Sequence, residues 1–477
     1  MTKLPTNPCD ASLTEITAAL AAREISSVEV TEASYARLQD SGSKLNALAG
    51  IDIEDARRQA LAADGAIGIG ALSGVPLAHK DMFYRPGRLT ECGSKVRRGF
   101  LPKTLSGALK NLDHAGALDV ARLNMAEFAF GVTGHNEITG DVRNPWNPDH
   151  MTGGSSSGSG AMVAARATFG ALGSDTGGSV RLPAACCGVV GMKVTMGRVS
   201  RYGAMPLSHT LDTIGPLTRT VTDNALMLSV LAGHDDDDAS SANIPVGDYL
   251  GDINAGVKGL KIGLPTSHFK DGITPELGDR FQAAVDVLKA SGADIIDVEL
   301  PDAIEHTNSL TSLITATEGA ALHQNWLETR RGEYGAQTFG RLAGGLSTPA
   351  TRYIQALNLR IELLAAFNDM VFSHVDVLMT PMMIMDVPTI KESDVRAGPG
   401  AGELLSKVGH CSRPVNFLGL PGLSVPSGFT KSGLPSSIQF IGRPFDEATL
   451  YRVGRAYERE TTWYDMQPDP SSWNIHS

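Results

Sequence analysis

Two clusters of serine and glycine, with a lysine upstream of both, are the residues of this chain best suited to chemistry. The first cluster is Gly153–Gly160 (G-G-S-S-S-G-S-G) and the second is Gly173–Ser179 (G-S-D-T-G-G-S), while Lys80 follows an apolar segment. Glycines let backbone N–H groups crowd around a reacting atom, and a serine hydroxyl beside a base becomes a nucleophile. Such clusters are also typical of flexible linkers. The pattern therefore indicates either acyl transfer by an activated hydroxyl or two linkers.

A serine nucleophile needs a base, and the sequence offers two kinds. Lys80 follows Val75–His79, so partial burial would lower its pKa and make the neutral amine accessible. The alternative is an ordinary surface lysine. Ser156 stands at the centre of a G-x-S-x-G string, which favours a histidine base, but none of the 12 histidines lies in a nucleophile-elbow pattern. Both possibilities stay open on pattern alone.

Helices and strands that alternate along the chain must position these residues. The pattern of apolar residues, with a capping box at Ser12–Glu15, predicts helices and strands along the whole length. No Gly/Ser/Pro linker separates two halves, so we expect one continuous α/β domain over residues 1–477. We expect strands at 74–78, 117–120, 171–174, 258–264, 294–298, 375–381, 422–426 and 437–441, and helices at 27–38, 54–63, 106–114, 161–169, 274–290, 309–330 and 447–458.

Composition excludes several classes of partner. The net charge of −11 over 477 residues argues against a nucleic-acid binder. No apolar run approaches eighteen residues and no signal peptide is visible, so we expect a cytoplasmic protein without membrane contact. The five cysteines lack metal-ligand spacing, and adjacent Cys186 and Cys187 are interpreted as small buried residues. The run Asp235–Asp238 is interpreted as a solvated loop, so no metal is expected.

The two clusters and their flanks resemble the amidase signature family. The strings Gly74–Asp81, Arg143–Asn147, Asp212–Leu217 and Gly419–Pro426 fit the family as well. Ser155 follows Lys80 by 75 positions and precedes Ser179 by 24, which agrees with the family spacing. The resemblance covers the whole chain and is strongest over residues 70–220, the expected core. It implies a single large domain whose central mixed sheet is covered by helices on both faces.

The resemblance also implies a role for each residue of a Ser-cisSer-Lys triad. Ser179 would be the nucleophile, and Ser155, in a cis peptide with Gly154, would relay its proton to Lys80. Backbone N–H groups of Thr176, Gly177, Gly178 and Ser179 would form the oxyanion hole. Gly131, Thr133 and Ser156 would contact the substrate, Ser156 also supporting the hydrogen-bond network. No cofactor or metal is implied.

Several neighbours of the triad have open or secondary interpretations. Ser157 stands where the family usually has glycine, and Ser159 is interpreted as a helix-start residue. Asp175 is expected to hold the turn or orient the site. Arg181 is expected to pair with Asp175 rather than with a substrate anion.

The resemblance places the acyl pocket in segments 128–133, 307–353 and 379–385. The methionine-rich segment Met379–Met385 is interpreted either as an adaptable apolar wall or as ordinary core. No cluster of unpaired arginines near these segments indicates an acidic substrate. The sequence does not name the amide.

The function implied is hydrolysis of a small-molecule carboxamide, anilide or carbamate through an acyl-enzyme. The alternative within the same fold is the A subunit of a tRNA-dependent amidotransferase, which takes ammonia from glutamine and works with partner subunits. A catalytically silent, ligand-binding member of the fold is a third interpretation, disfavoured because all three triad residues are present. A homodimer is expected by analogy only.

Overall fold

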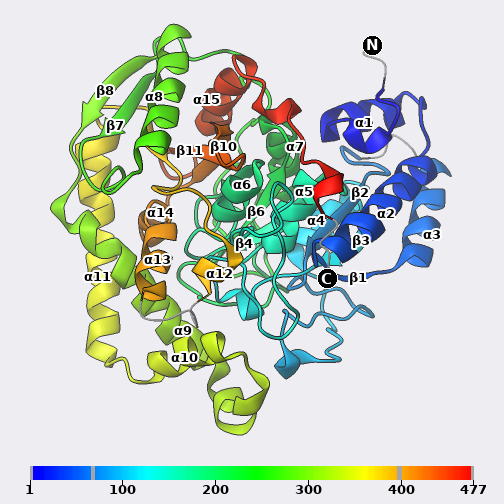
Figure 1. Ribbon diagram of the computed structural model, residues 1–477, viewed down its shortest axis with the longest axis horizontal. Helices are drawn as coiled ribbons and strands as arrows, with labels where there is room; N and C mark the ends of the chain where they lie inside the picture. Colours follow the sequence, from blue (N-terminus) through cyan, green and yellow to red (C-terminus); the bar gives the residue numbers. More distant parts are fainter. Residues whose placement is uncertain (1–3, 66–69, 395–399, 474–477) are drawn as a thin grey trace.

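Two β-sheets organise the computed structural model, which describes residues 4–65, 70–394 and 400–473 (Figure 1). The large sheet has eight strands in the order β4-β6-β5-β10-β11-β9-β7-β8, and the small sheet has three in the order β1-β3-β2. Both sheets are mixed: β10 is antiparallel to β5 and β11, whereas β7 is parallel to β8 and β9, and β2 is parallel to β3. The strands are β1 (Leu48–Ile51), β2 (Pro76–Lys80), β3 (Leu118–Leu123), β4 (Gly170–Asp175), β5 (Val190–Lys193), β6 (Thr213–Thr218), β7 (Lys261–Pro265), β8 (Asp294–Val298), β9 (Val377–Pro381), β10 (Gly422–Phe429) and β11 (Pro435–Ile441).

Helices surround the sheets, and several begin with the caps that their sequences predict. The capping box of Ser12 and Glu15 starts α1, and a second box of Ser26 and Glu29 starts α2. The helices are α1 (Leu13–Ala21), α2 (Ser27–Lys44), α3 (Ile53–Gly65), α4 (Gly107–His114), α5 (Ser157–Ala164), α6 (Arg181–Cys187), α7 (Val221–Leu231), α8 (Pro275–Ala290), α9 (Thr307–Thr329), α10 (Ala336–Leu346), α11 (Ala350–Phe367), α12 (Ile390–Ser393), α13 (Ala401–Val408), α14 (Arg413–Leu418) and α15 (Glu447–Arg459).

Strand β10 shows how the large sheet is covered on both faces. Neighbouring residues of a strand point to opposite faces. Gly422 faces Val415 of α14 and Arg181 of α6, whereas Leu423 packs against Gly454 of α15. Helices α7 and α8 contact α15 and so belong to the helices on the Leu423 face of the sheet. Helix α5 contacts α6 and so belongs to those on the Gly422 face. The chain is therefore an α/β domain with a central mixed sheet flanked by helices, as expected.

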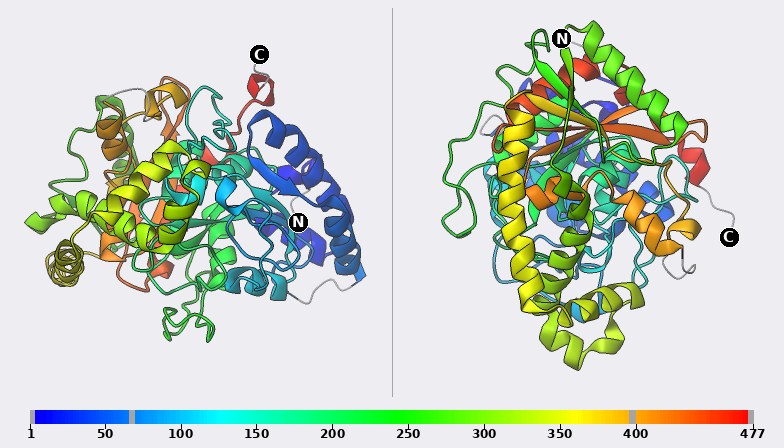
Figure 2. Two further views of the ribbon diagram at one scale, coloured as in Figure 1. Left: turned by 90° about the horizontal axis from the view of Figure 1, so that it is seen from below. Right: turned by 90° about the vertical axis from the view of Figure 1, so that its left-hand side faces the viewer.

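Different helices and strands form the two ends of the molecule. The small sheet and α1–α3 lie at one end, and α9, α10 and α11 gather at the other, with α13 and α14 between them and the large sheet (Figures 1 and 2). The C-terminal segment returns to the first end, where Trp473 Nε1 donates to the carbonyl of Pro145 at 2.8 Å. Strands β2 and β4 contact each other, which joins the two sheets. That junction is where the serine clusters and Lys80 meet.

Most predicted elements are present, with one clear error. The β-α-β pattern at 258–298 is confirmed, because β7 and β8 pair in parallel around α8. The helix expected at 161–169 instead spans Ser157–Ala164, so the glycine-serine run forms its first turn and Ser159 lies inside it. The helix ends early because Arg166 has a positive φ of 56°, which breaks the right-handed helix before β4 begins. The linker interpretation of both clusters is wrong, since all of their residues except the half-buried Gly177 are buried.

Cysteines and helix lengths bear on two expectations from composition. Within the described part of the chain the five cysteines are free and buried, as interpreted for Cys186 and Cys187. In residues 4–65, 70–394 and 400–473, no helix has the length and apolar character needed to cross a membrane. The limits 1–477 expected for the domain extend into termini outside the described residues.

Candidate active site

Lys80 is the centre of a buried hydrogen-bond network. It is the last residue of β2 and only 1% exposed, so the surface-lysine alternative is wrong. Its Nζ donates to Ser155 Oγ at 2.7 Å and to Ser174 Oγ at 2.9 Å. His79 fixes the strand from the other side, because its Nδ1 accepts the N–H of Leu172 on β4 at 3.2 Å. The junction of β2 with β4 therefore places the lysine between the two serine clusters.

The surroundings of Lys80 make its neutral form accessible near neutral pH. Burial lowers the pKa of Lys80 to about 7, against a smaller opposing effect of Asp212 and Asp175. Burial also raises the pKa of Asp212, whose carboxylate accepts the Thr176 hydroxyl at 2.5 Å. A neutral amine has a lone pair that can accept a proton from a hydroxyl. Lys80 is thus suited to act as a base.

Ser155 and Ser179 lie in adjoining turns above this lysine. The Gly154–Ser155 peptide is cis. The N–H of Ser156 donates to the carbonyl of Ser179 at 3.3 Å, which holds the two clusters against each other. Ser179 lines a cavity, and in the described part of the chain its hydroxyl makes no hydrogen bond, so it remains available to a ligand. Hydrogen bonds of catalytic hydroxyls commonly tighten only when substrate is bound.

Ser156 has a different environment from the other two serines. It is buried, and its hydroxyl accepts the N–H of Ser174 at 3.3 Å and lies 3.4 Å from the carbonyl oxygen of Ser174. No histidine among the described residues forms a hydrogen bond with it. The nucleophile-elbow interpretation therefore finds no support, while the supporting role expected for Ser156 in the network is present.

Asp175 holds the loop that carries Ser179. Its carboxylate accepts the N–H groups of Gly178 at 2.8 Å and Val180 at 3.1 Å, and pairs with the Arg181 guanidinium at 3.0 Å. Burial raises the pKa of Asp175, but the charge and hydrogen bonds of Arg181, together with smaller effects of Lys193 and Asn416, outweigh burial and hold that pKa well below its usual range. Arg181 pairs with Asp175 rather than facing a substrate, as expected.

The same contacts decide which N–H groups of the loop are available. Gly178 has φ +123°, and a side chain there would overlap Ser412 Oγ, so only glycine fits. Its N–H is already bound by Asp175, which differs from its expected place in the oxyanion hole. Within the described residues the N–H groups of Thr176, Gly177 and Ser179 make no such bond. These three are the loop's available donors.

A cavity of about 800 Å³ opens in front of Ser179. Gly131 lines it, whereas Thr133 and Ser156 do not, and the contact expected between these residues and a substrate stays a prediction. Residues 129–132 and parts of α9 and α10 form its walls, in agreement with the acyl-pocket segments predicted for these regions. The lining also includes residues from segments that the sequence did not indicate: Leu207, His268, Asp271, Gly402, Leu405, Ser406, His410 and Arg413.

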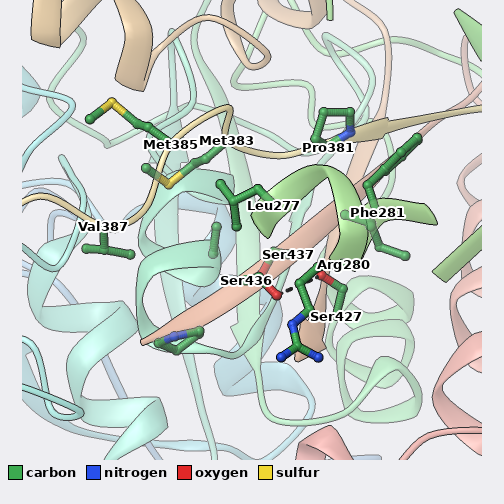
Figure 3. A pocket seen from close by; sticks show the side chains of 13 residues that line it. Leu277, Arg280, Phe281, Pro381, Met383, Met385, Val387, Ser427, Ser436 and Ser437 are labelled. Carbon is green, nitrogen blue, oxygen red and sulfur yellow. Dashed lines mark hydrogen bonds between the residues drawn. The ribbon is translucent and has the colours of Figure 1, made fainter. Parts of the chain in front are cut away.

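The methionine-rich segment does not belong to this cavity. Met383 and Met385 lie with Leu277 and Phe281 of α8 around a separate, nearly filled pocket (Figure 3). Met379 and Met382 are fully buried. The interpretation as an adaptable wall of the acyl pocket is therefore wrong, and the segment fills the core between α8 and the sheet.

Some residues of the site were missed at the level of sequence. Ser174 received no role although it lies in the second cluster, five positions before Ser179, and its side chain alternates toward β2. Ser412, Asn416 and Gln439 also bind the Asp175–Arg181 pair, by contacts of 2.5–3.1 Å. No local sequence pattern predicts these three residues, because they lie more than 230 positions after Arg181 in the chain.

Comparisons with known proteins identify the family of this chain. A family model described as Amidase matches residues 29–451. The A subunit of the glutamyl-tRNA(Gln) amidotransferase of Myxococcus xanthus (strain DK1622) is 39% identical over 481 residues, which cover 95% of this chain and 98% of that protein.

Two solved structures are also similar. One, described as "An unexpected vestigial protein complex reveals the evolutionary origins of an s-triazine catabolic enzyme", has a TM-score of 0.88 and 31% identity, covering 94% of this chain and 98% of that chain. A bacterial aryl acylamidase has a TM-score of 0.86 and 27% identity, covering 95% and 97%. Fold and family together define an amidase, a hydrolase acting on carbon–nitrogen bonds. The chain belongs to the amidase signature family.

Proposed function

We propose that this chain hydrolyses a small-molecule carboxamide, anilide or carbamate through an acyl-enzyme on Ser179. The observation that carries the proposal is the buried Lys80 amine bonded to Ser155 at 2.7 Å, behind a serine that faces a cavity of about 800 Å³. An uncharged, desolvated amine beside a relay hydroxyl is a base for a serine nucleophile.

In the proposed first half-reaction, neutral Lys80 accepts a proton from Ser155 while Ser155 accepts one from Ser179. The Ser179 oxygen attacks the amide carbon, and the carbonyl electrons move onto its oxygen. N–H groups of Thr176, Gly177 and Ser179 would stabilise that oxyanion, and losing one such donor typically costs about 3 kcal/mol of transition-state stabilisation. The relay then returns the proton to the nitrogen, the carbon–nitrogen bond breaks, and an amine or ammonia leaves.

In the second half-reaction, water repeats the attack on the resulting ester. Lys80 accepts a proton from water through the same relay and returns it to the Ser179 oxygen as the ester bond breaks. The product is a carboxylic acid or, from a carbamate, its carbonic acid half-ester. Every proton transfer uses side chains of this chain.

A second candidate is the A subunit of a tRNA-dependent amidotransferase. It is favoured by the 39% identity with the Myxococcus xanthus protein over 98% of that protein's length. In this function Ser179 would release ammonia from glutamine, and partner subunits would be required. The chemistry at Ser179 is the same in both candidates, so the difference lies in substrate and partners.

The test is turnover by the purified chain alone. We expect hydrolysis of at least one member of a panel of aliphatic amides, anilides and aryl carbamates, and loss of about 10⁴-fold or more in kcat for Ser179→Ala. Ser229→Ala, an exposed serine on α7, serves as the matched control. Full activity of Ser179→Ala would overturn the assignment. Glutamine hydrolysis that appears only with co-purifying partner subunits would establish the second candidate instead.

A further inference from the structure

Two arginines that have no carboxylate partner among the described residues line the cavity in front of Ser179. Arg341 comes from α10 and Arg413 from the first position of α14, and both are half-buried. Arg341 Nη1 lies 3.5 Å from the carbonyl of Phe130, and Arg413 Nη2 donates to the carbonyl of Leu405 at 3.3 Å. A guanidinium has five N–H donors, so most donors of both groups are unused within the described chain.

The pair of arginines lies close to the loop that carries Ser179. The side chain of Arg413 runs past Gly177, whose missing Cβ would lie 3.8 Å from Arg413 Cγ. The guanidinium then lies over Gly409, where a Cβ would stand only 2.7 Å from Arg413 Cζ, so glycine makes room for it. Arg341 lies against the carbonyl of Phe130, which precedes the cavity-lining Gly131. The two cations therefore approach one ligand space from two helices.

The electrostatics of the pair are those of an anion site. Burial lowers the pKa of Arg341 to about 10. Burial, and the neighbouring charge of Arg341, lower the pKa of Arg413 to about 10. Two like charges in a partly desolvated cavity repel each other, and each also loses favourable hydration. An anion bound between them would offset both the repulsion and the lost hydration. Both groups nevertheless stay charged at neutral pH.

The acidic residues of the same cavity do not neutralise this pair. Asp271 and Glu305 line the cavity but are exposed, and Asp271 accepts the N–H of His268. In the part of the chain that the structure describes, neither carboxylate forms an ion pair with the two arginines. This corrects the sequence-based expectation that no unpaired arginines lie near the acyl segments.

Two uncharged polar atoms of the cavity lining also have no partner. Asn308 donates to His410 Nδ1 at 3.3 Å, and His410 Nε2 donates to the His268 carbonyl at 2.8 Å. This leaves Asn308 Oδ1 and His268 Nε2 buried without a hydrogen bond in the described chain. Buried polar atoms are normally satisfied, so these indicate a polar ligand rather than an apolar one.

We propose that the cavity binds amides whose acyl part ends in a carboxylate, and that Arg341 and Arg413 together bind that carboxylate. This deepens the proposed amidase function and rests on it for the reaction, but not for binding. A carboxylate offers two oxygens to planar guanidinium groups and forms short, charge-assisted hydrogen bonds with them. Half-amides of dicarboxylic acids are the simplest members of this substrate class. Arg413 thereby becomes a residue that determines substrate specificity.

Binding is tested on the Ser179→Ala protein, which removes turnover from the measurement. Calorimetry with succinate, glutarate and adipate should detect binding of at least one of them, while the neutral diamide glutaramide binds at least tenfold more weakly. Arg413→Met in this background should weaken dicarboxylate binding by about 10- to 100-fold, and Arg413→Lys by less. Arg459→Met, an exposed arginine at the end of α15, is the matched control. A thermal melt of each variant shows that it is folded, and Arg341→Met gives a second, independent removal of charge.

Specificity is then tested in the active protein. The ratio of kcat/KM for glutaramate to that for its neutral methyl ester should fall about tenfold or more in Arg413→Met. Equal dicarboxylate affinity of folded Arg413→Met and its parent would overturn the proposal, as would tighter binding of inorganic phosphate than of any dicarboxylate. Arginine-dependent dicarboxylate binding without cleavage of any amide would leave the anion site standing and overturn the proposed function.

Discussion

Arg181 and Arg413 both lie beside the loop that carries Ser179, but in the part of the chain that the structure describes only Arg181 has a carboxylate partner. Arg181 is fully buried and bound by Asp175, Asn416 and Gln439. Arg413 faces a cavity, and within the described chain its guanidinium donates to the carbonyl of Leu405. A buried charge whose hydrogen-bond donors are all paired holds the surrounding residues in place. A partly buried charge with unused donors can bind a ligand instead. The contrast separates the part of the site that positions the catalyst from the part that selects the substrate.

The largest effect should come from removing the base on the positioning side. Lys80→Met should lower kcat by about 10³-fold or more, because Ser179 loses the acceptor for its proton. The same variant should have a free energy of unfolding about 1–3 kcal/mol higher than the parent protein. The buried amine of Lys80, whose pKa is lowered to about 7, costs stability when it is charged, and Lys80→Met removes that cost. Turnover and urea denaturation measure the two quantities. Lys110→Met, at an exposed position of α4, is the control, and full activity of Lys80→Met would remove Lys80 from the mechanism.

A smaller effect distinguishes the two arginines directly. Arg181→Met should lower the free energy of unfolding by about 3–5 kcal/mol, because it leaves the Asp175 carboxylate buried and unpaired. Arg413→Met should change it by less than about 1 kcal/mol, because no carboxylate among the described residues pairs with it. Urea denaturation of both variants gives the comparison. Equal losses of stability would mean that Arg413 is structural as well.

Acid should weaken the same buried pair in the parent protein. The folded pKa of Asp175 lies well below its unfolded value, so its contribution is present above the unfolded pKa and is lost as the pH falls toward the folded one. Urea denaturation of the parent protein at successively lower acidic pH measures this loss.

The smallest predicted effect is the pH dependence of turnover on a neutral amide. Since Lys80 acts as a base only when deprotonated, kcat/KM should fall about tenfold per pH unit below pH 7 and level off above it. Lys193 is also buried, and its pKa is lowered to about 7, so Lys193→Met tests whether another lysine causes the profile. The profile should persist in that variant. A rate that stays constant down to pH 5 would contradict a lysine base.

The sequence predicted the positioning side of the site because its residues are local. Lys80, Ser155, Asp175 and Ser179 stand in two glycine-rich strings and one strand end, and the resemblance of these strings to the amidase signature family brought them together. Ser174 could have been added from the alternation of β4, which turns its side chain toward Lys80.

The substrate side could not be predicted in the same way. Arg341 and Arg413 meet only because α10 and α14 are brought to one cavity by tertiary packing, and neither stands in a recognisable motif. For Met383 and Met385 the sequence left a pocket wall and ordinary core both open, and packing against α8 decides for the core. Composition and spacing describe local geometry, while a cavity is a property of segments far apart in the chain.

The central claim is that Ser179 carries the acyl group, and trapping it tests this most directly. The purified chain is incubated with a slowly deacylating aryl ester, quenched in acid and mapped by peptide mass spectrometry. We predict one added acyl mass per chain, located on Ser179 and absent from the Ser179→Ala protein. An acyl group on Ser155 or Ser156, or an unmodified Ser179 during turnover, would contradict the account.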